Sequence, residues 1–233
     1  MFGKKLLVAS AVLATAVSTA SYGAVANILP SDGFTAIPNS TGTNVMFYSG
    51  YYYSYETTES FLKYDLSSIE APLGQTLVIN SVAISVNYGA SLQGDPAAFT
   101  QNLFYVSDDT WTGGAVQWAN RPVAGETVVA SDTRPAAWSN VNIFNSTPSL
   151  VSLVQSEADG DGTLSLMFNA SGLVPTSNGT GTDQHAEYYA VGTQMAPRLD
   201  VDYSFAPVPE PASIGLLGTS LVYMLTRRRR SVA

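Results

Sequence analysis

The sequence predicts an all-β fold: a single jelly-roll-like antiparallel β-sandwich, flanked by an N-terminal signal helix and a C-terminal transmembrane helix. Between Asn27 and Phe205 the chain is rich in Gly, Pro, Ser, Thr and Asn and carries short apolar alternations of period two, typical of strands with one buried face. Turn dipeptides such as Gly113-Gly114 and Asp159-Gly160 separate these alternations. Several short strands with turns between them indicate a sandwich.

The strand and helix signals differ in strength along this body. The clearest strand runs from Leu77 to Val86, where apolar residues alternate with small or polar ones. The same alternation recurs at Leu103-Tyr105, Leu164-Phe168 and Leu199-Tyr203. One helix is predicted, at 148–158, because Pro148 can start it and Leu150, Val151 and Val154 would share a face.

The N-terminus predicts export. Lys4 and Lys5 precede an apolar run from Leu6 to about Val17, which is short for a membrane span. Ala24-Val25-Ala26 then provides small residues at the positions that signal peptidase requires. We therefore expect residues 1–26 to be a signal peptide cleaved after Ala26, with signal peptidase as a partner.

The C-terminus carries a second membrane signal. Pro209, Glu210 and Pro211 precede an apolar stretch from Ala212 to Leu225. The stretch is short for a span but adequate for a thin or transient anchor. Arg227, Arg228, Arg229 and Arg230 follow it and should stay cytoplasmic, which puts the body outside. A GPI-type tail competes, but such tails lack a terminal arginine cluster.

This tail resembles the PEP-CTERM sorting signal of Gram-negative bacteria. The Pro-Glu-Pro motif, short apolar helix and arginine cluster are all present, in order and at the extreme C-terminus. The resemblance implies cleavage near the motif by an exosortase-type enzyme and a link to exopolysaccharide and biofilm matrix. It also implies transient anchoring in the inner membrane before release to the outer surface or matrix. A plain membrane anchor is the simpler alternative.

Charge and composition exclude several functions. The formal net charge is −8, but residues 27–207 hold only four basic residues against 17 acidic ones, a net −13. Such a body repels nucleic acid and anionic lipid headgroups. The absence of cysteine excludes disulfides and thiolate chemistry.

Two segments of the body resemble the DNRLRE-type β-sandwich domain. Residues 61–69, Phe-Leu-Lys-Tyr-Asp-Leu-Ser-Ser-Ile, are similar to its "L-(R/K)-F-D-L-S-S-I-P-x-G" segment. Residues 111–122 are similar to its "W-T-E-G-x-V-T-W-N-N-R-P" segment, with Gly113 in place of Glu and Ala119 in place of Asn. Ala196 to Tyr203 match its last strand. Some relatives of that domain bind polysaccharides such as alginate, although residues 27–59 match poorly and carry a tyrosine-rich insertion.

These segments also predict local structure. Val116 and Trp118 are expected on one face of a strand, filling core, with Trp111 capping one end of the sandwich. Arg121, in an acidic body, is expected to pair with a carboxylate. Asp65, with the serines that follow it, is expected to form a polar turn that ends a strand.

Catalysis is not expected. The single histidine, His185, has no nucleophile elbow elsewhere in the chain, and one histidine without cysteine cannot make a typical zinc site. With 17 acids in the body, a chance pair of carboxylates is expected and does not indicate glycoside hydrolysis.

One weak metal signal remains. In residues 157–162, Asp159 and Asp161 place oxygens at alternating positions before a glycine, as calcium loops do. Phe168 stands where an EF-hand needs its twelfth-position glutamate, and Asp-Gly pairs are also ordinary hairpin turns. The segment is therefore either a plain turn or a calcium-stabilised one. No other cofactor is expected.

The most distinctive feature is an aromatic strip at residues 47–55. Tyr51, Tyr53 and Tyr55 would share one face of a strand and Tyr52 the other. Aromatic faces stack on sugars and phenol hydroxyls bond sugar hydroxyls, so the strip is a candidate glycan-binding surface. A partly buried edge hairpin is the alternative.

Together these observations predict three regions: a signal peptide at 1–26, a sandwich at 27–205 and a sorting tail at 206–233. The expected function is that of an exported, non-catalytic surface or matrix protein that binds polysaccharide. A polysaccharide lyase or hydrolase, and a structural module with no small ligand, are the alternatives.

Overall fold

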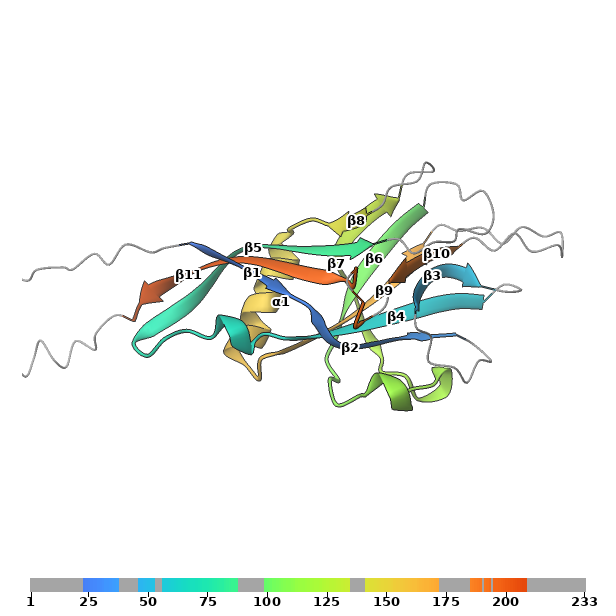
Figure 1. Ribbon diagram of the computed structural model, residues 1–233, viewed down its shortest axis with the longest axis horizontal. Helices are drawn as coiled ribbons and strands as arrows, with labels where there is room; N and C mark the ends of the chain where they lie inside the picture. Colours follow the sequence, from blue (N-terminus) through green and yellow to red (C-terminus); the bar gives the residue numbers. More distant parts are fainter. Residues whose placement is uncertain are drawn as a thin grey trace, which may run out of the picture.

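The computed structural model describes residues 23–37, 46–52, 56–87, 99–134, 141–171, 185–189, 191–193 and 195–208. They form two antiparallel sheets packed face to face, with one helix at the side (Figure 1). The strands are β1 (Ala24–Ile28), β2 (Pro30–Ala36), β3 (Met46–Tyr52), β4 (Glu56–Asp65), β5 (Gln75–Asn87), β6 (Phe99–Val106), β7 (Ala124–Arg134), β8 (Val141–Phe144), β9 (Thr163–Ser171), β10 (His185–Tyr189) and β11 (Arg198–Pro207). The helices are α1 (Pro148–Asp159) and the 3₁₀ turns η1 (Ser67–Ile69), η2 (Gly113–Ala115) and η3 (Trp118–Asn120).

The strand order confirms a jelly-roll-like sandwich. The smaller sheet has the order β1-β11-β5-β8, which brings the first and last strands side by side. The larger sheet has the order β10-β3-β4-β9-β6-β7, and β2 also pairs with β4. Apart from β3–β4 and β6–β7, neighbouring strands are not consecutive in the sequence, so several connections cross between the two sheets.

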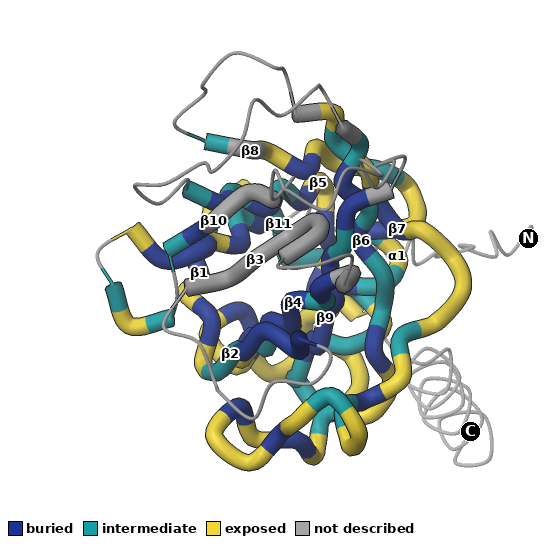
Figure 2. Tube along the Cα trace, turned by 90° about the vertical axis from the view of Figure 1, so that its right-hand side faces the viewer, coloured by how far each residue is buried: buried dark blue, intermediate teal, exposed yellow. Residues whose placement is uncertain are grey.

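The main hydrophobic core lies between the two sheets, where buried tube segments of both layers face each other (Figure 2). Leu62 and Tyr64 of β4, Leu103 of β6 and Leu166 and Phe168 of β9 contribute from the larger sheet, and each is fully buried. The smaller sheet adds the expected alternation of β5 and β11. Without disulfides, this buried apolar surface is the principal stabilising term.

The predicted strand at 77–86 is confirmed as β5, with one irregularity that the sequence already contains. Its buried positions step by two from Leu77 to Ile79, then by three to Val82. The register against β11 shifts between Asp202 and Tyr203 at the same place. A β-bulge therefore absorbs the extra residue and returns Val82, Ile84 and Val86 to the inner face.

The predicted helix is confirmed as α1. The Thr147 hydroxyl accepts a hydrogen bond from the backbone N–H of Leu150 at 3.1 Å, and Pro148 occupies the first turn, both typical of helix starts. Gln155 accepts from the N–H of Ile79 at 2.9 Å and donates to the carbonyl of Leu77 at 3.2 Å. The helix thus covers an edge of β5 that would otherwise expose backbone groups.

A second, smaller core lies on the opposite face of the larger sheet. It contains Phe34, Ala36, Phe61, Val106, Trp111, Val116 and Met167. The segment between β6 and β7, residues 107–123 (hereafter the cover loop), supplies Trp111 and Val116 to it. Phe34 and Phe61 stack with ring centroids 4.6 Å apart, and Trp111 meets Phe34 edge-on at 5.1 Å.

The second core differs from the sequence-based expectations for Val116, Trp118 and Trp111. Val116 is buried as expected, but it lies in irregular backbone before η3, so the strand predicted for Val116 and Trp118 is wrong. Trp111 does not cap an end of the sandwich as expected, because its side chain points from the cover loop onto the outer face of the larger sheet, against Phe34 and Phe61. The predicted polar turn is confirmed, since Asp65 accepts from the N–H of Ser67 at 2.9 Å where β4 gives way to η1.

The expected terminal helices and the sorting motif at 209–211 lie outside the described residues. Within the described part of the chain, no helix combines the length and apolar character that a membrane crossing requires. The expected domain start at Asn27 falls inside β1, because that strand already begins at Ala24.

Candidate functional site

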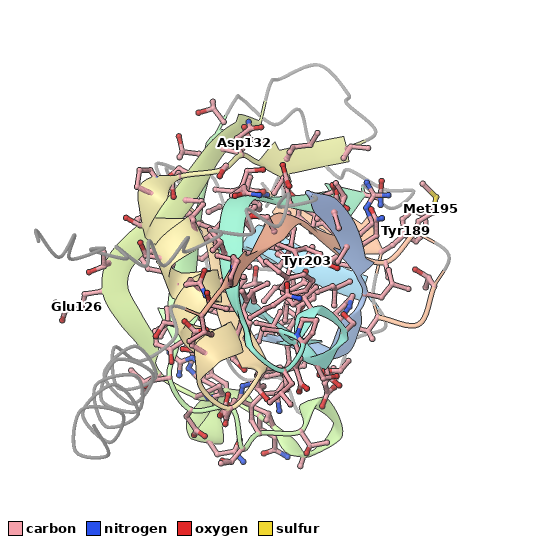
Figure 3. The ribbon with its side chains drawn as sticks, turned by 90° about the vertical axis from the view of Figure 1, so that its left-hand side faces the viewer. Glu126, Asp132, Tyr189, Met195 and Tyr203 are labelled. Carbon is pink, nitrogen blue, oxygen red and sulfur yellow. The ribbon has the colours of Figure 1, made fainter. Side chains whose placement is uncertain are left out.

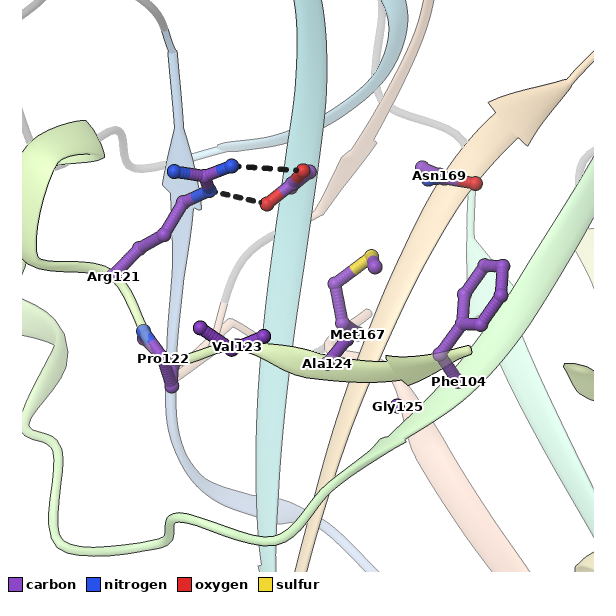
Figure 4. Close-up of a pocket in the computed structure, with 9 residues that line it drawn as sticks. Phe104, Arg121, Pro122, Val123, Ala124, Gly125, Met167 and Asn169 are labelled. Carbon is purple, nitrogen blue, oxygen red and sulfur yellow. Dashed lines mark hydrogen bonds and ion pairs between the residues drawn. The ribbon is translucent and has the colours of Figure 1, made fainter. Parts of the chain in front are cut away.

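A pocket of about 270 Å³ opens where the end of the cover loop meets the outer face of the larger sheet (Figure 4). The sheet contributes Glu59 from β4, Phe104 from β6 and Met167 and Asn169 from β9. The end of the cover loop and the start of β7 form the opposite wall, from Arg121 to Gly125.

Arg121 is the most constrained polar residue of the pocket. Its Nε donates to Glu59 Oε2 at 2.5 Å and its Nη2 to Glu59 Oε1 at 3.3 Å, a two-point ion pair (Figure 4). Its Nη1 donates to the carbonyl of Trp118 at 2.9 Å, and the guanidinium carbon lies 3.7 Å from the centre of a Trp118 ring. This confirms the predicted carboxylate partner. The guanidinium thereby fastens the cover loop to β4.

The floor of the pocket is apolar and its rim is exposed. Phe104 and Met167 lie opposite each other in the β6–β9 register, so their side chains share the outer face. Val123, on the rim, is 83 % exposed. A floor of this kind suits the C–H face of a ring-shaped ligand, while the polar groups around it fix orientation.

A row of polar side chains leads from the pocket across the outer face of the sheet. Asn169 pairs in register with Asn102, which pairs with Ser131 of β7, and the Ser131 hydroxyl donates to Asn102 Oδ1 at 3.0 Å. In the next row Thr100 faces Thr133, with their hydroxyls 3.5 Å apart. We call Asn102, Asn169, Ser131, Thr100 and Thr133 the polar ladder.

The middle of the cover loop is held by close backbone contact with β2. The N–H of Gly113 donates to Asp32 Oδ2 at 2.9 Å. A Cβ at Gly113 would lie 2.7 Å from Asp32 Oδ1 and 2.7 Å from the carbonyl oxygen of Gly33, so only glycine fits. The glycine that departs from the resembled motif is therefore required by this chain's own packing.

Lys63 holds the first part of the same loop. Its Nζ donates to the carbonyl of Asp109 at 2.6 Å and to the carbonyl of Trp111, and lies 4.2 Å from the centre of the Trp111 ring. The Lys63 ammonium therefore already binds groups of the protein itself.

The described cations of the body are all engaged. Besides Lys63 and Arg121, Arg198 pairs with Asp200, with Nε to Oδ1 at 2.7 Å. The side chain of Arg134 is not described. Among the described side chains, then, each positive charge faces a protein acceptor, and the pocket offers no cation to an anionic ligand.

Three carboxylates and a tyrosine gather where the cover loop begins, near the β9 start. Burial, then hydrogen bonding and repulsion from Asp161, raise the pKa of Asp109. Burial, followed by a hydrogen bond to Glu157, raises the pKa of Tyr105 to about 12. The proximity of Asp109 to Asp161 was not predicted from the sequence, because 52 positions separate them.

The expected calcium residues already have protein partners. Asp159 Oδ2 accepts from Gln155 at 3.0 Å, and Asp161 Oδ1 accepts from the N–H of Thr163 at 2.9 Å. No group of three or more His, Asp and Glu suited to a metal occurs among the described residues. Calcium at this turn stays a prediction, which a change in melting temperature on adding chelator would check.

The structure describes only part of the tyrosine strip. Tyr51 and Tyr52 end β3 and pair with Thr57 and Glu56 of β4, but their side chains lie outside the described set. Tyr53 and Tyr55 lie outside the described residues altogether, as do the sorting motif and the arginine cluster. The expected cleavage residues Ala24 and Ala26 both lie in β1.

Sequence reasoning found Arg121 but missed the rest of the pocket. Met167 and Asn169 lie between buried neighbours, and Phe104 lies between buried Leu103 and half-buried Tyr105, in strands that the alternation predicts. Their alternation with Leu103 and Phe168 was the available signal, because it places them on the face away from the main core.

The fold and the pocket define a β-sandwich binding module with an open, mixed apolar and polar site on one sheet. The chain belongs to carbohydrate-binding module family 96, whose family model matches residues 38–189. The VP1 pentamer of human polyomavirus 6 is similar at 12 % identity over 81 % of this chain and 95 % of that chain, with a TM-score of 0.26. Comparison with curated proteins finds no match.

Proposed function

We propose that the chain is an exported, non-catalytic protein that binds a neutral polysaccharide through the pocket at Arg121 and the adjoining polar ladder. The observation that carries this proposal is that every residue lining the pocket lies within the segment matched by the carbohydrate-binding family. The pocket joins an apolar floor to a row of amide and hydroxyl groups, the combination that sugar rings require.

Charge defines the class of polysaccharide. The body carries a net −13, and its described cations are occupied by Glu59, Asp200 and backbone carbonyls. A uronate chain would meet this negative field without a positive partner. A neutral, hydroxyl-rich glycan meets no such penalty and can exchange hydrogen bonds with the amides and hydroxyls of the ladder.

The pocket itself favours binding over hydrolysis. Glycoside hydrolases of the common type need two carboxyl groups flanking the bond. Among the described residues, Glu59 is the only acid that lines this pocket, and both of its oxygens are bonded to Arg121. A carboxylate held in this way neither donates a proton nor attacks a sugar carbon readily.

The ends of the chain support export and sorting. The charged and apolar N-terminal segment and the Pro209-Glu210-Pro211 tail with its arginine cluster have the order of a secretion signal and a PEP-CTERM signal. Signal peptidase and an exosortase-type enzyme would be the processing partners. The folded module would then reach the cell surface or the matrix, where extracellular polysaccharide is available to it.

A calorimetric titration of the purified protein with soluble neutral polysaccharides tests the binding proposal. Asn169→Ala and Val123→Ser alter the pocket, whereas Val78→Ser changes an exposed position of the smaller sheet and is the matched control. We expect saturable binding that the pocket variants weaken at least five-fold and the control leaves unchanged. Equal binding by all three variants would contradict the assignment of the pocket.

A further inference from the structure

Strand β1 belongs to the folded body over its whole length. Its five residues pair in unbroken register with β11, from Ala24 opposite Tyr203 to Ile28 opposite Leu199. Ile28 is 7 % exposed, and Ala26 packs against the main core. Figure 3 looks onto this end of the sandwich, with Tyr203 beside β1.

Cleavage after Ala26 would divide this strand. Only Asn27 and Ile28 would remain paired, while Val201 to Tyr203 of β11 would lose their β1 partners and keep those in β5. That edge of β11 borders the main core. Val201 is fully buried in the core, and Tyr203 and Phe205 pack against the core. An open edge strand beside the core is an aggregation hazard.

The sequence offers another cleavage position upstream of β1. Ser18-Thr19-Ala20 directly follows the apolar run that ends near Val17, and it places small residues at −3 and −1. Both positions satisfy the residue preference of signal peptidase. Only the upstream one leaves β1 whole.

We propose that signal peptidase cuts after Ala20, so that the mature chain begins at Ser21 and retains all of β1. This rests on the proposed export of the protein. Because cleavage precedes folding, the fold does not shield Ala26. We favour cleavage after Ala20 because this site directly follows the apolar run. The pairing of β1 with β11 supports this choice, since residues 24–26 take part in it.

Intact-mass measurement of the exported protein from a Gram-negative producing host tests this directly. A chain that begins at Ser21 is the expected result, and a chain that begins at Asn27 overturns the proposal. A chain that keeps Met1 and stays inside the cell would overturn export itself, which distinguishes that failure from a misplaced site.

Two matched variants assign the site independently of the mass. Ala20→Val and Ala26→Val each place a β-branched residue at one candidate −1 position, and valine is compatible with a strand at position 26. We expect Ala20→Val to accumulate precursor and Ala26→Val to be processed normally. The reverse pattern contradicts the proposal.

A third experiment tests whether residues 24–26 stabilise the folded protein. Purified chains that begin at Ser21 and at Asn27 are compared by thermal unfolding. Loss of the Ala24–Ala26 pairing should lower the melting temperature of the shorter chain by about 5 °C or more. Equal melting temperatures would remove the reason for preferring the upstream site.

Discussion

Replacing Arg121 with alanine should destabilise the protein substantially, although the residue lies at the surface. The change removes the two-point pair with Glu59, the hydrogen bond to the Trp118 carbonyl and the stacking on the Trp118 ring. The side chains of Arg121 and Glu59 are 29 % and 21 % exposed, so the pair is only partly screened by water.

The expected magnitude follows from these three contacts. A well-placed, partly buried pair contributes about 1 kcal/mol, the hydrogen bond to the carbonyl about 1 kcal/mol, and the cation–π contact about 0.5 kcal/mol. A total of about 2.5 kcal/mol corresponds to a fall in melting temperature of about 5–10 °C for a domain of this size.

Thermal unfolding followed by circular dichroism measures this, in a double-mutant cycle with Glu59→Gln. We expect a coupling free energy of about 1 kcal/mol between the two positions. A fall below 1 °C for Arg121→Ala, or fully additive effects in the double mutant, would refute the conclusion that this pair fastens the cover loop to β4.

Three further changes probe other parts of the structure. Gly113→Ala should lower the melting temperature by several degrees, since a Cβ there meets the backbone of β2, whereas Gly114→Ala should not, because no atom of the described residues lies within 4 Å of its Cβ position. Tyr64→Phe should leave stability unchanged or raise it by about 1 kcal/mol, because burial raises the pKa of Tyr64 and its hydroxyl has no hydrogen-bond partner among the described residues. Asp109→Asn should raise the melting temperature at pH 7 and have no effect near pH 3. The pKa of Asp109 is raised in the folded protein, so the stability it contributes when protonated is lost as the pH rises past its ordinary value.

Each of these changes has an outcome that would count against it. Equal melting temperatures for Gly113→Ala and Gly114→Ala would mean that the cover loop adjusts freely. A clear loss of stability in Tyr64→Phe would reveal a partner for the hydroxyl. A stabilisation by Asp109→Asn that persists at pH 3 could not come from ionisation of this carboxyl.

The layered fold could be predicted because its signals are local. The alternation in β5 and the start of α1 at Pro148 are written in neighbouring residues, and both elements form as expected. Even the three-residue step from Ile79 to Val82 was visible, although its cause, a bulge against β11, requires knowledge of the partner strand.

The candidate site could be predicted only in part, because its residues come together through strand pairing. Arg121 was expected to meet a carboxylate, but nothing local selects Glu59 among 17 acids, 62 positions earlier in the chain. Trp118 resembled a strand residue because apolar and polar residues alternate around it. The short turns η2 and η3 instead fold the cover loop back over the sheet, and that reversal depends on the contact of Gly113 with β2.

The most direct test of the central claim is a titration of the purified wild-type protein against neutral and uronate-containing polysaccharides, with the sugar analysed afterwards. We predict saturable binding of at least one neutral polysaccharide, weaker binding of uronate chains, and no new chain ends. Release of new ends, or binding restricted to the anionic polysaccharides, would contradict it.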